Sequence, residues 1–175
     1  MSIDLLRKRY MNEPKVLCTG NPNKHNTIAS GVKAVYPEAT FIHLSNGYDF
    51  TTANLDDLFK THNIFINASY IAPGLQEKLL DRYIAVGKMG HVFNIGSVYE
   101  YDGNGKNPDY VKSKQDLYAA SVENNNFRIN TTHVILGSVD EQYISPLQIA
   151  QQIKWITEQK FKVPVMGMDQ EKAAW

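Results

Sequence analysis

Tyr110 and Lys114 are the side chains best suited to chemistry in this chain of 175 residues. Asn107 and Pro108 before them are typical of a helix start, so Tyr110 falls in the first helical turn, with Lys114 one turn later on the same face. A phenol, with a pKa of about 10, exchanges protons poorly at neutral pH unless its anion is stabilised. The lysine cation and the positive end of the helix both favour that anion. The two residues therefore form either an acid–base pair or a packed surface tyrosine beside a solvated lysine.

Neither a metal site nor nucleic-acid binding is indicated. The five histidines show no HxxxH or HExxH spacing, and the single cysteine, Cys18, lies in an apolar run that is typical of a small buried residue. Binding to the phosphates of DNA or RNA usually needs a basic excess, whereas Lys plus Arg equals Asp plus Glu here, at 18 each. We expect no metal and no nucleic-acid partner.

Length and composition predict one soluble unit. With 43% hydrophobic and 21% charged residues, a chain of this length can bury a hydrophobic core of its own. No composition shift suggests a boundary, so residues 1–175 are expected to form a single domain. Residues 1–13 hold no apolar stretch long enough for a signal peptide or a membrane span. A cytoplasmic location without membrane attachment is the resulting expectation.

Short apolar strands alternate with helical segments, which is the pattern of a parallel sheet with crossover helices. The expected strands are residues 15–19, 40–45, 63–67, 91–95, 128–134 and 163–166. The expected helices are residues 26–36, 54–60, 74–86, 108–123 and 146–159. This order predicts an α/β fold: a Rossmann-type, doubly wound parallel sheet in three layers, with helices on both faces.

Polar and turn-forming residues follow several of these strands directly. In a doubly wound sheet, ligands bind beyond the carboxyl ends of the strands, where the strand order reverses. The residues expected at this edge are Thr19, Gly20, Asn21, Asn67, Ala68, Ser69, Gly96 and Ser97. The sequence therefore predicts a ligand-binding edge, which Tyr110 and Lys114 approach from the next helix.

The order of these features resembles the short-chain dehydrogenase/reductase family. The resemblance is carried by residues 15–20 (KVLCTG, like the first strand and TGxxxGxG loop), 49–51 (DFT, like the Asp-apolar-Thr segment at the adenine), 67–69 (NAS, like NNAG), 90–97 (GHVFNIGS, like the strand that ends in the catalytic serine), 110–114 (YVKSK, the YxxxK motif) and 127–130 (FRIN, like IRVN). It spans nearly the whole chain, from about residue 15 to residue 168.

The resemblance implies an NAD(P)-dependent oxidoreductase that acts on a carbonyl or alcohol. Tyr110 would exchange a proton with the substrate oxygen, and Lys114 would hold the nicotinamide ribose. Ser97 would donate a hydrogen bond to the same oxygen, unless it only satisfies backbone groups at the strand end. The residues implied at the cofactor are Thr19, Gly20, Asn21, Lys24, Ser45, Asp49, Asn67, Ala68 and Lys114. A simple turn role is an equal alternative for Asn67, and Asn94, inside a strand, is expected to be structural.

The glycine loop departs from the family pattern. Lys24 and Asn26 replace the two later glycines of TGxxxGxG, which permit close approach of the backbone to a pyrophosphate and of the helix to the strand. Lys24 either pairs with a phosphate or marks a loss of cofactor binding. The chain is also shorter than the family normally is and has a reduced substrate lid. A dinucleotide-binding or regulatory protein without turnover is therefore the alternative.

The choice of cofactor and the assembly state are two further expectations. NAD-preferring Rossmann proteins carry an acid at the end of the second strand, whereas here Ser45 stands at that end and Lys24 lies in the first loop. NADP(H) is therefore favoured over NAD(H). The family pairs the helix that carries YxxxK with its copy in a partner subunit. Because this helix offers Val111, Leu117, Tyr118 and Val122 beyond what one apolar stripe needs, we expect a homodimer or homotetramer.

Overall fold

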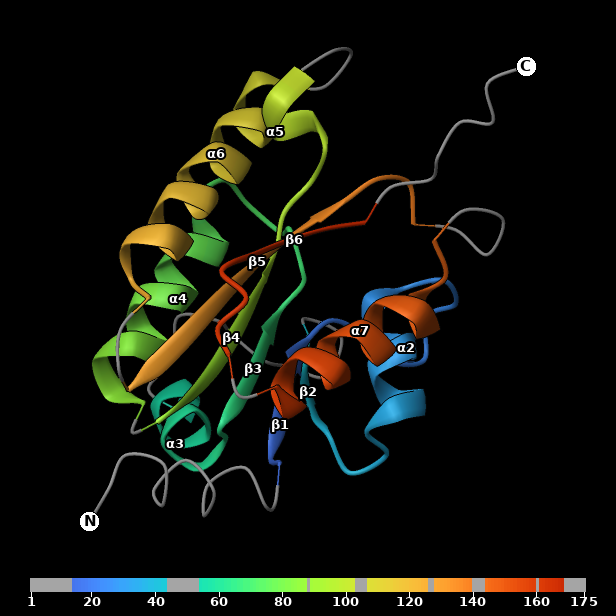
Figure 1. Ribbon diagram of the computed structural model, residues 1–175, viewed down its shortest axis with the longest axis vertical. Helices are drawn as coiled ribbons and strands as arrows, with labels where there is room; N and C mark the ends of the chain where they lie inside the picture. Colours follow the sequence, from blue (N-terminus) through green and yellow to red (C-terminus); the bar gives the residue numbers. More distant parts are fainter. Residues whose placement is uncertain are drawn as a thin grey trace.

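One parallel sheet organises the chain in the computed structural model, which describes residues 14–43, 54–87, 89–102, 107–125, 128–139, 144–159 and 161–168. The six strands lie in the order β2-β1-β3-β4-β5-β6 (Figure 1). Their bounds are β1 Val16–Thr19, β2 Thr40–Ile42, β3 Ile64–Asn67, β4 Gly90–Ile95, β5 Ile129–Leu136 and β6 Val165–Met168. The strand order reverses at β1, which pairs with both β2 and β3. The predicted switch point therefore lies beyond the carboxyl ends of β1 and β3.

Helices cover both faces of this sheet. Their bounds are α2 Ile28–Val35, α3 Asn54–Thr61, α4 Leu75–Val86, α5 Tyr99–Asp102, α6 Pro108–Glu123 and α7 Pro146–Glu158. Helices α2 and α7 lie side by side on one face, and α3, α4 and α6 cover the other (Figure 1). The predicted α/β fold in three layers is confirmed, as are the expected strands and helices, with ends that differ by a few residues. The short helix α5 was not expected.

Each face of the sheet has its own hydrophobic core, and the strands contribute to both because their side chains alternate between the two faces. In β3, Ile64 and Ile66 face the α2/α7 layer, while Phe65 between them packs with Phe59 and Tyr83 on the opposite face. Successive side chains of a strand point to opposite faces, so a strand of a doubly covered sheet is buried on both sides and is largely apolar. This burial explains why several strands appear in the sequence as short apolar runs, whereas β5 also contains buried polar side chains that form hydrogen bonds.

The start of α6 is determined by local chemistry. The Asn107 side chain accepts a hydrogen bond from the backbone N–H of Asp109 at 2.8 Å, and Pro108 occupies the first helical position. These two residues place Tyr110 in the first turn, as the sequence predicts. The helix runs from Pro108 to Glu123, the bounds expected from its capping residues.

Gly31 allows α2 to pack directly on the start of α7. A methyl group at this position would overlap the Pro146 carbonyl group, which belongs to the backbone and cannot rotate away. We therefore expect Gly31→Ala to lower the free energy of unfolding by about 3 kcal/mol, at the upper end for overpacked positions. Urea unfolding followed by circular dichroism measures this change. Gly167→Ala is the matched control, because a methyl group there meets no atom within 4 Å; equal stability of the two variants would contradict the prediction.

Candidate functional site

Lys114 is buried beside Tyr110, with only 3% of its surface exposed. Its ammonium group donates hydrogen bonds of 2.7 Å to the Gln76 side-chain oxygen and 2.7 Å to the Ile95 carbonyl oxygen. Its Nζ atom also lies 5.6 Å from the centre of the half-buried Tyr110 ring. The structure thus brings the two residues together on one face of α6, and the lysine is not the solvated surface residue of the alternative interpretation.

Burial makes the charged form of the Lys114 side chain less favourable. Burial lowers the pKa of Lys114 to about 8, against an opposing effect of the Glu100 charge, and no carboxylate of the described residues forms an ion pair with it. Because the folded pKa lies below that of the unfolded chain, the buried charge costs stability below about pH 8, and this cost disappears as the pH rises towards about 10.5. Buried lysines without an ion-pair partner are rare and concentrate at functional sites.

Ser97 lies at the same edge of the sheet, two residues after Ile95. It is buried, and its hydroxyl oxygen accepts a hydrogen bond from the Tyr99 backbone N–H at 3.3 Å. Its own N–H donates to the Glu100 carboxylate at 3.4 Å. Ser97 therefore caps the start of α5, yet a hydroxyl that accepts one bond still has its O–H to donate. The geometry is compatible with both roles considered for this serine.

A buried Glu100–His133 pair supports this turn. The His133 ring nitrogen Nε2 lies 3.0 Å from a Glu100 carboxylate oxygen, and the two side chains are 0% and 2% exposed. Gly96 must be glycine, because a methyl group there would overlap His133 Nε2. The Gln115 side chain of α6 donates to the Glu100 carbonyl at 2.8 Å, which ties α5 to α6. This pair could not be predicted from the sequence, since its members are 33 residues apart and one lies on the unexpected α5.

A chain of buried hydrogen bonds links Lys114 to Ser97. After Gln76, it passes through side chains of β3, β4, α6 and β5. Its successive members are Gln76, Asn67, Asn94, Ser121, His133 and Glu100. Hydrogen bonds in a buried environment of low dielectric are stronger than in water, so they hold these side chains in place around the site. Asn94 has the structural role that the sequence predicts, because its side chain joins Asn67 to Ser121.

Asn67 does not contribute its side chain to an open binding surface. It is fully buried, and its amide nitrogen donates to the Gln76 carbonyl at 2.7 Å and to Asn94 at 2.9 Å. Its side-chain oxygen is buried without a hydrogen-bond partner. The side chain of Asn67 therefore lies in the interior and not in the wall of a cavity, and the expected role of this residue at the cofactor stays a prediction.

A cavity of about 480 Å³ opens beyond the carboxyl ends of β1, β2 and β3. Five predicted cofactor residues line it, namely Thr19, Gly20, Asn21, Lys24 and Ala68. His43, directly after β2, also lines it, as do Ile28 and Ala29 in the first turn of α2. Asn67 and Lys114 are not in its wall, and Ser45 and Asp49 lie outside the described residues. The structure thus gathers most of the predicted cofactor residues at the switch point of the sheet.

Gly20 is the glycine that remains in the loop after β1, and it allows two loops to pack closely. Gly20 has a φ of +129°, and a methyl group there would lie 3.1 Å from the Ala29 side chain and 3.2 Å from the Ser69 hydroxyl. Before it, the Thr19 hydroxyl accepts hydrogen bonds from the N–H groups of Ala68 and Ser69, at 2.8 and 2.9 Å. Gly20 therefore allows the loops after β1 and β3 to meet at the cavity floor.

The two replaced glycines have different consequences. Asn26 has a φ of +52°, in the left-handed region that glycine adopts freely and that asparagine tolerates better than most residues. The glycine-like backbone is therefore retained at this position. Lys24 is exposed in the cavity wall, so its side chain projects a positive charge at the place where the family pattern has no side chain.

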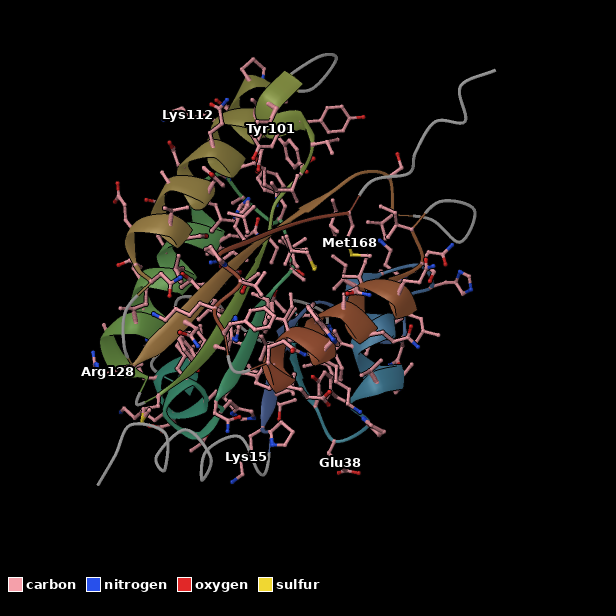
Figure 2. The ribbon with its side chains drawn as sticks, viewed as in Figure 1. Lys15, Glu38, Tyr101, Lys112, Arg128 and Met168 are labelled. Carbon is pink, nitrogen blue, oxygen red and sulfur yellow. The ribbon has the colours of Figure 1, made fainter. Side chains whose placement is uncertain are left out.

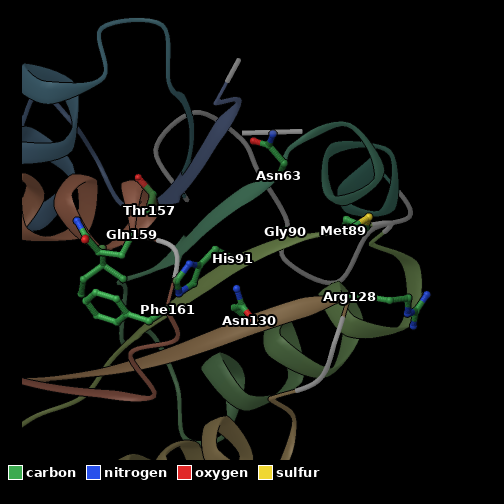
Figure 3. Close-up of a pocket in the computed structure, with 10 residues that line it drawn as sticks. Asn63, Met89, Gly90, His91, Arg128, Asn130, Thr157, Gln159 and Phe161 are labelled. Atoms are coloured by element: carbon green, nitrogen blue, oxygen red, sulfur yellow. The ribbon is translucent and has the colours of Figure 1, made fainter. Parts of the chain in front are cut away.

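A second cavity lies at the opposite edge of the sheet, where strands begin (Figure 3). Its lining includes Asn63, His91, Asn130 and Phe161, and its volume is about 50 Å³. Binding sites for cofactor-sized molecules usually have volumes of at least about 300 Å³. The large cavity beside β1 is therefore the better candidate site.

Within the described ranges no helix is long and apolar enough to cross a membrane, and no group of three or more His, Cys, Asp or Glu could hold a metal ion.

Comparison with known proteins supports the fold. No family model and no curated protein sequence matches the chain. Among solved structures, serine dehydrogenase from Escherichia coli superposes with a TM-score of 0.67 at 12% identity, covering 91% of this chain and 99% of that one. A short-chain dehydrogenase/reductase described as a glucose/ribitol dehydrogenase, from Brucella melitensis, gives 0.66 at 10% identity, covering 88% and 94%. A 4-hydroxyisoleucine dehydrogenase complexed with NADH and succinate gives 0.64 at 16% identity, covering 89% and 97%. The chain therefore has the fold of the short-chain dehydrogenases/reductases.

Proposed function

We propose that the protein is an NAD(P)-dependent oxidoreductase that interconverts a carbonyl and an alcohol, with Tyr110 as the acid–base residue. The observation that carries this proposal is the buried ammonium of Lys114, which lacks an ion-pair partner in the described residues and lies beside the Tyr110 ring. In this proposal, the lysine charge beside the ring assists proton transfer through the Tyr110 hydroxyl. A bound nicotinamide dinucleotide would supply or accept the hydride.

The cavity beside β1 fits the phosphates of such a cofactor. The N–H groups of Ile28 and Ala29 belong to the first turn of α2, where amides lack partners within the helix and favour an anion. Lys24 adds a charge to this cavity, and Gly20 leaves space at its floor. One of the similar solved structures is described as complexed with NADH, which supports a nucleotide cofactor.

Lys114, Ser97 and Tyr110 would each have a separate role in the proposed reaction. Two of the three N–H donors of Lys114 are used by Gln76 and Ile95, which leaves one for Tyr110 or for a ribose hydroxyl. Ser97 would donate its O–H to the substrate oxygen, and the Glu100–His133 pair would hold the Ser97 turn in position. Tyr110 would then exchange the proton with that oxygen.

A dinucleotide-binding protein without turnover is the second candidate. It is favoured by one observation, the Tyr70 ring, which packs against Tyr110 at a centroid distance of 4.8 Å and lines the cavity. Monitoring NADPH oxidation with a panel of aldehydes and ketones separates the two functions: turnover supports the enzyme, whereas tight binding without turnover supports the second candidate.

NADPH is expected to bind more tightly than NADH, by about tenfold or more, because the 2′-phosphate can form a charge-assisted hydrogen bond with Lys24. The cavity wall contains Lys24 and His43 and, among the described lining residues, no carboxylate. Titration followed by nicotinamide fluorescence measures both affinities.

Lys24→Gln should remove most of this preference, whereas Lys154→Gln, on the exposed surface of α7, should leave it unchanged. Tighter binding of NADH to the parent protein would contradict the prediction. Failure of both nucleotides to bind would overturn the proposed function itself.

A further inference from the structure

The segment between β3 and α4 is held at both ends. At its start, the N–H groups of Ala68 and Ser69 are bound by the Thr19 hydroxyl. At its end, the Gly74 N–H donates to the Ser113 hydroxyl of α6 at 3.2 Å. Between these attachments, Tyr70 and Ile71 are 37% and 39% exposed, the only large apolar side chains of this segment to reach solvent. The ends of the segment are therefore fixed, and Tyr70 is the ring that it carries over the site.

Tyr70 joins the cavity to the Tyr110–Lys114 pair. Its side chain lines the cavity, while its ring meets the Tyr110 ring edge to face at 4.8 Å. The Lys114 ammonium lies 5.8 Å from the Tyr70 ring centre and 5.6 Å from the Tyr110 ring centre. Neither Tyr110 nor Lys114 is in the cavity wall. A molecule in the cavity therefore meets Tyr70 before it reaches the ammonium.

We propose that Tyr70 is a gate that divides the binding site into a nucleotide half, open in this structure, and a reaction half, closed by its ring. The proposal rests on the proposed function. The adenosine phosphate part of a dinucleotide binds the open half without rearrangement, whereas the nicotinamide part must displace the Tyr70 ring from Tyr110 and Lys114. Displacement breaks an aromatic pair and a cation–π contact, so it weakens binding of the whole dinucleotide and leaves binding of the adenosine part unchanged.

The test compares NADPH with adenosine 2′,5′-bisphosphate, which lacks the nicotinamide half. Tyr70→Ala opens the gate, so its NADPH affinity should rise by about two- to tenfold, the free energy of an aromatic pair. Its affinity for the bisphosphate, which loses only a contact with the cavity wall, should not rise. Tyr70→Phe retains the ring and should keep the parent ratio of the two affinities. Tyr101→Ala, which removes an exposed tyrosine outside the cavity wall (Figure 2), controls for loss of a surface ring. Calorimetry measures both ligands.

A second measurement needs no cofactor. Acylation of Lys114 by an amine-reactive ester, located by mass spectrometry, should be faster in Tyr70→Ala than in Tyr70→Phe, because only the first change uncovers the ammonium. Equal labelling rates, or an NADPH affinity that is unchanged or lower in Tyr70→Ala, would overturn the gate. Faster labelling of Tyr70→Ala with no binding of either nucleotide to any variant would overturn the proposed function, and with it the role of Tyr70 as a gate for a dinucleotide.

Discussion

Tyr110→Phe is expected to lower turnover of a carbonyl substrate by about 10² to 10⁴-fold, the usual contribution of general acid–base catalysis. The substitution removes the phenol hydroxyl but retains the ring that packs against Tyr70. The hydrogen bonds of the Lys114 ammonium go to Gln76 and Ile95 and not to the Tyr110 hydroxyl, so the fold and the cofactor affinity should barely change. The loss should therefore appear in kcat.

Steady-state kinetics on a substrate identified by the carbonyl panel measure this effect. Tyr118→Phe is the matched control, because it removes a second tyrosine hydroxyl from the same helix, two turns further along. Its turnover should remain that of the parent. A Tyr110→Phe variant as active as the parent would show that another group exchanges the proton.

The pH dependence of turnover provides an independent check on the same site. Since burial lowers the pKa of Lys114 to about 8, the lysine loses its charge as the pH rises through this value. The positive charge beside the Tyr110 ring is then lost, so turnover should fall above about pH 8. Lys114→Ala should remove this dependence and should lower turnover and cofactor affinity together, because it deletes both the charge and a hydrogen-bond donor.

His133→Ala is expected to lower the free energy of unfolding by about 3 kcal/mol, because it leaves the buried Glu100 carboxylate without its ring-nitrogen hydrogen-bond partner. The Glu100 side chain is 2% exposed, and without His133 its carboxylate keeps only the Ser97 N–H as a hydrogen-bond donor among the described residues. Its desolvation is then poorly compensated. Chemical denaturation at neutral pH measures the change.

The Asp56–Arg82 ion pair offers the matched comparison. Its side chains are 31% and 27% exposed, so Asp56→Asn should change stability far less than His133→Ala. A double variant with Leu at both position 100 and position 133 should recover much of the lost stability, because two apolar groups leave no charge unpaired. If His133→Ala were as stable as Asp56→Asn, the pair would contribute nothing to the stability of the fold.

Much of the architecture is determined locally and could be predicted from the sequence. Most strands are largely apolar because both sheet faces are covered, and each apolar run is visible without knowledge of its neighbours. Asn107 and Pro108 set the first residue of α6, which in turn places Tyr110 and Lys114 one turn apart on the same face. Thr19 and Gly20 lie at the end of β1, at the edge where a parallel sheet binds its ligands.

The partners of these side chains were decided only by the tertiary structure. Nothing in the spacing of the sequence links Lys114 to Gln76, 38 residues away, or Glu100 to His133, because such pairs depend on how helices are seated on the sheet. The packing of the helices on the sheet also places the Asn67 amide in the interior and the Tyr70 ring between the cavity and Lys114. Local propensity and periodicity specify which face a residue occupies, whereas burial and hydrogen bonding between distant segments specify what that residue meets there.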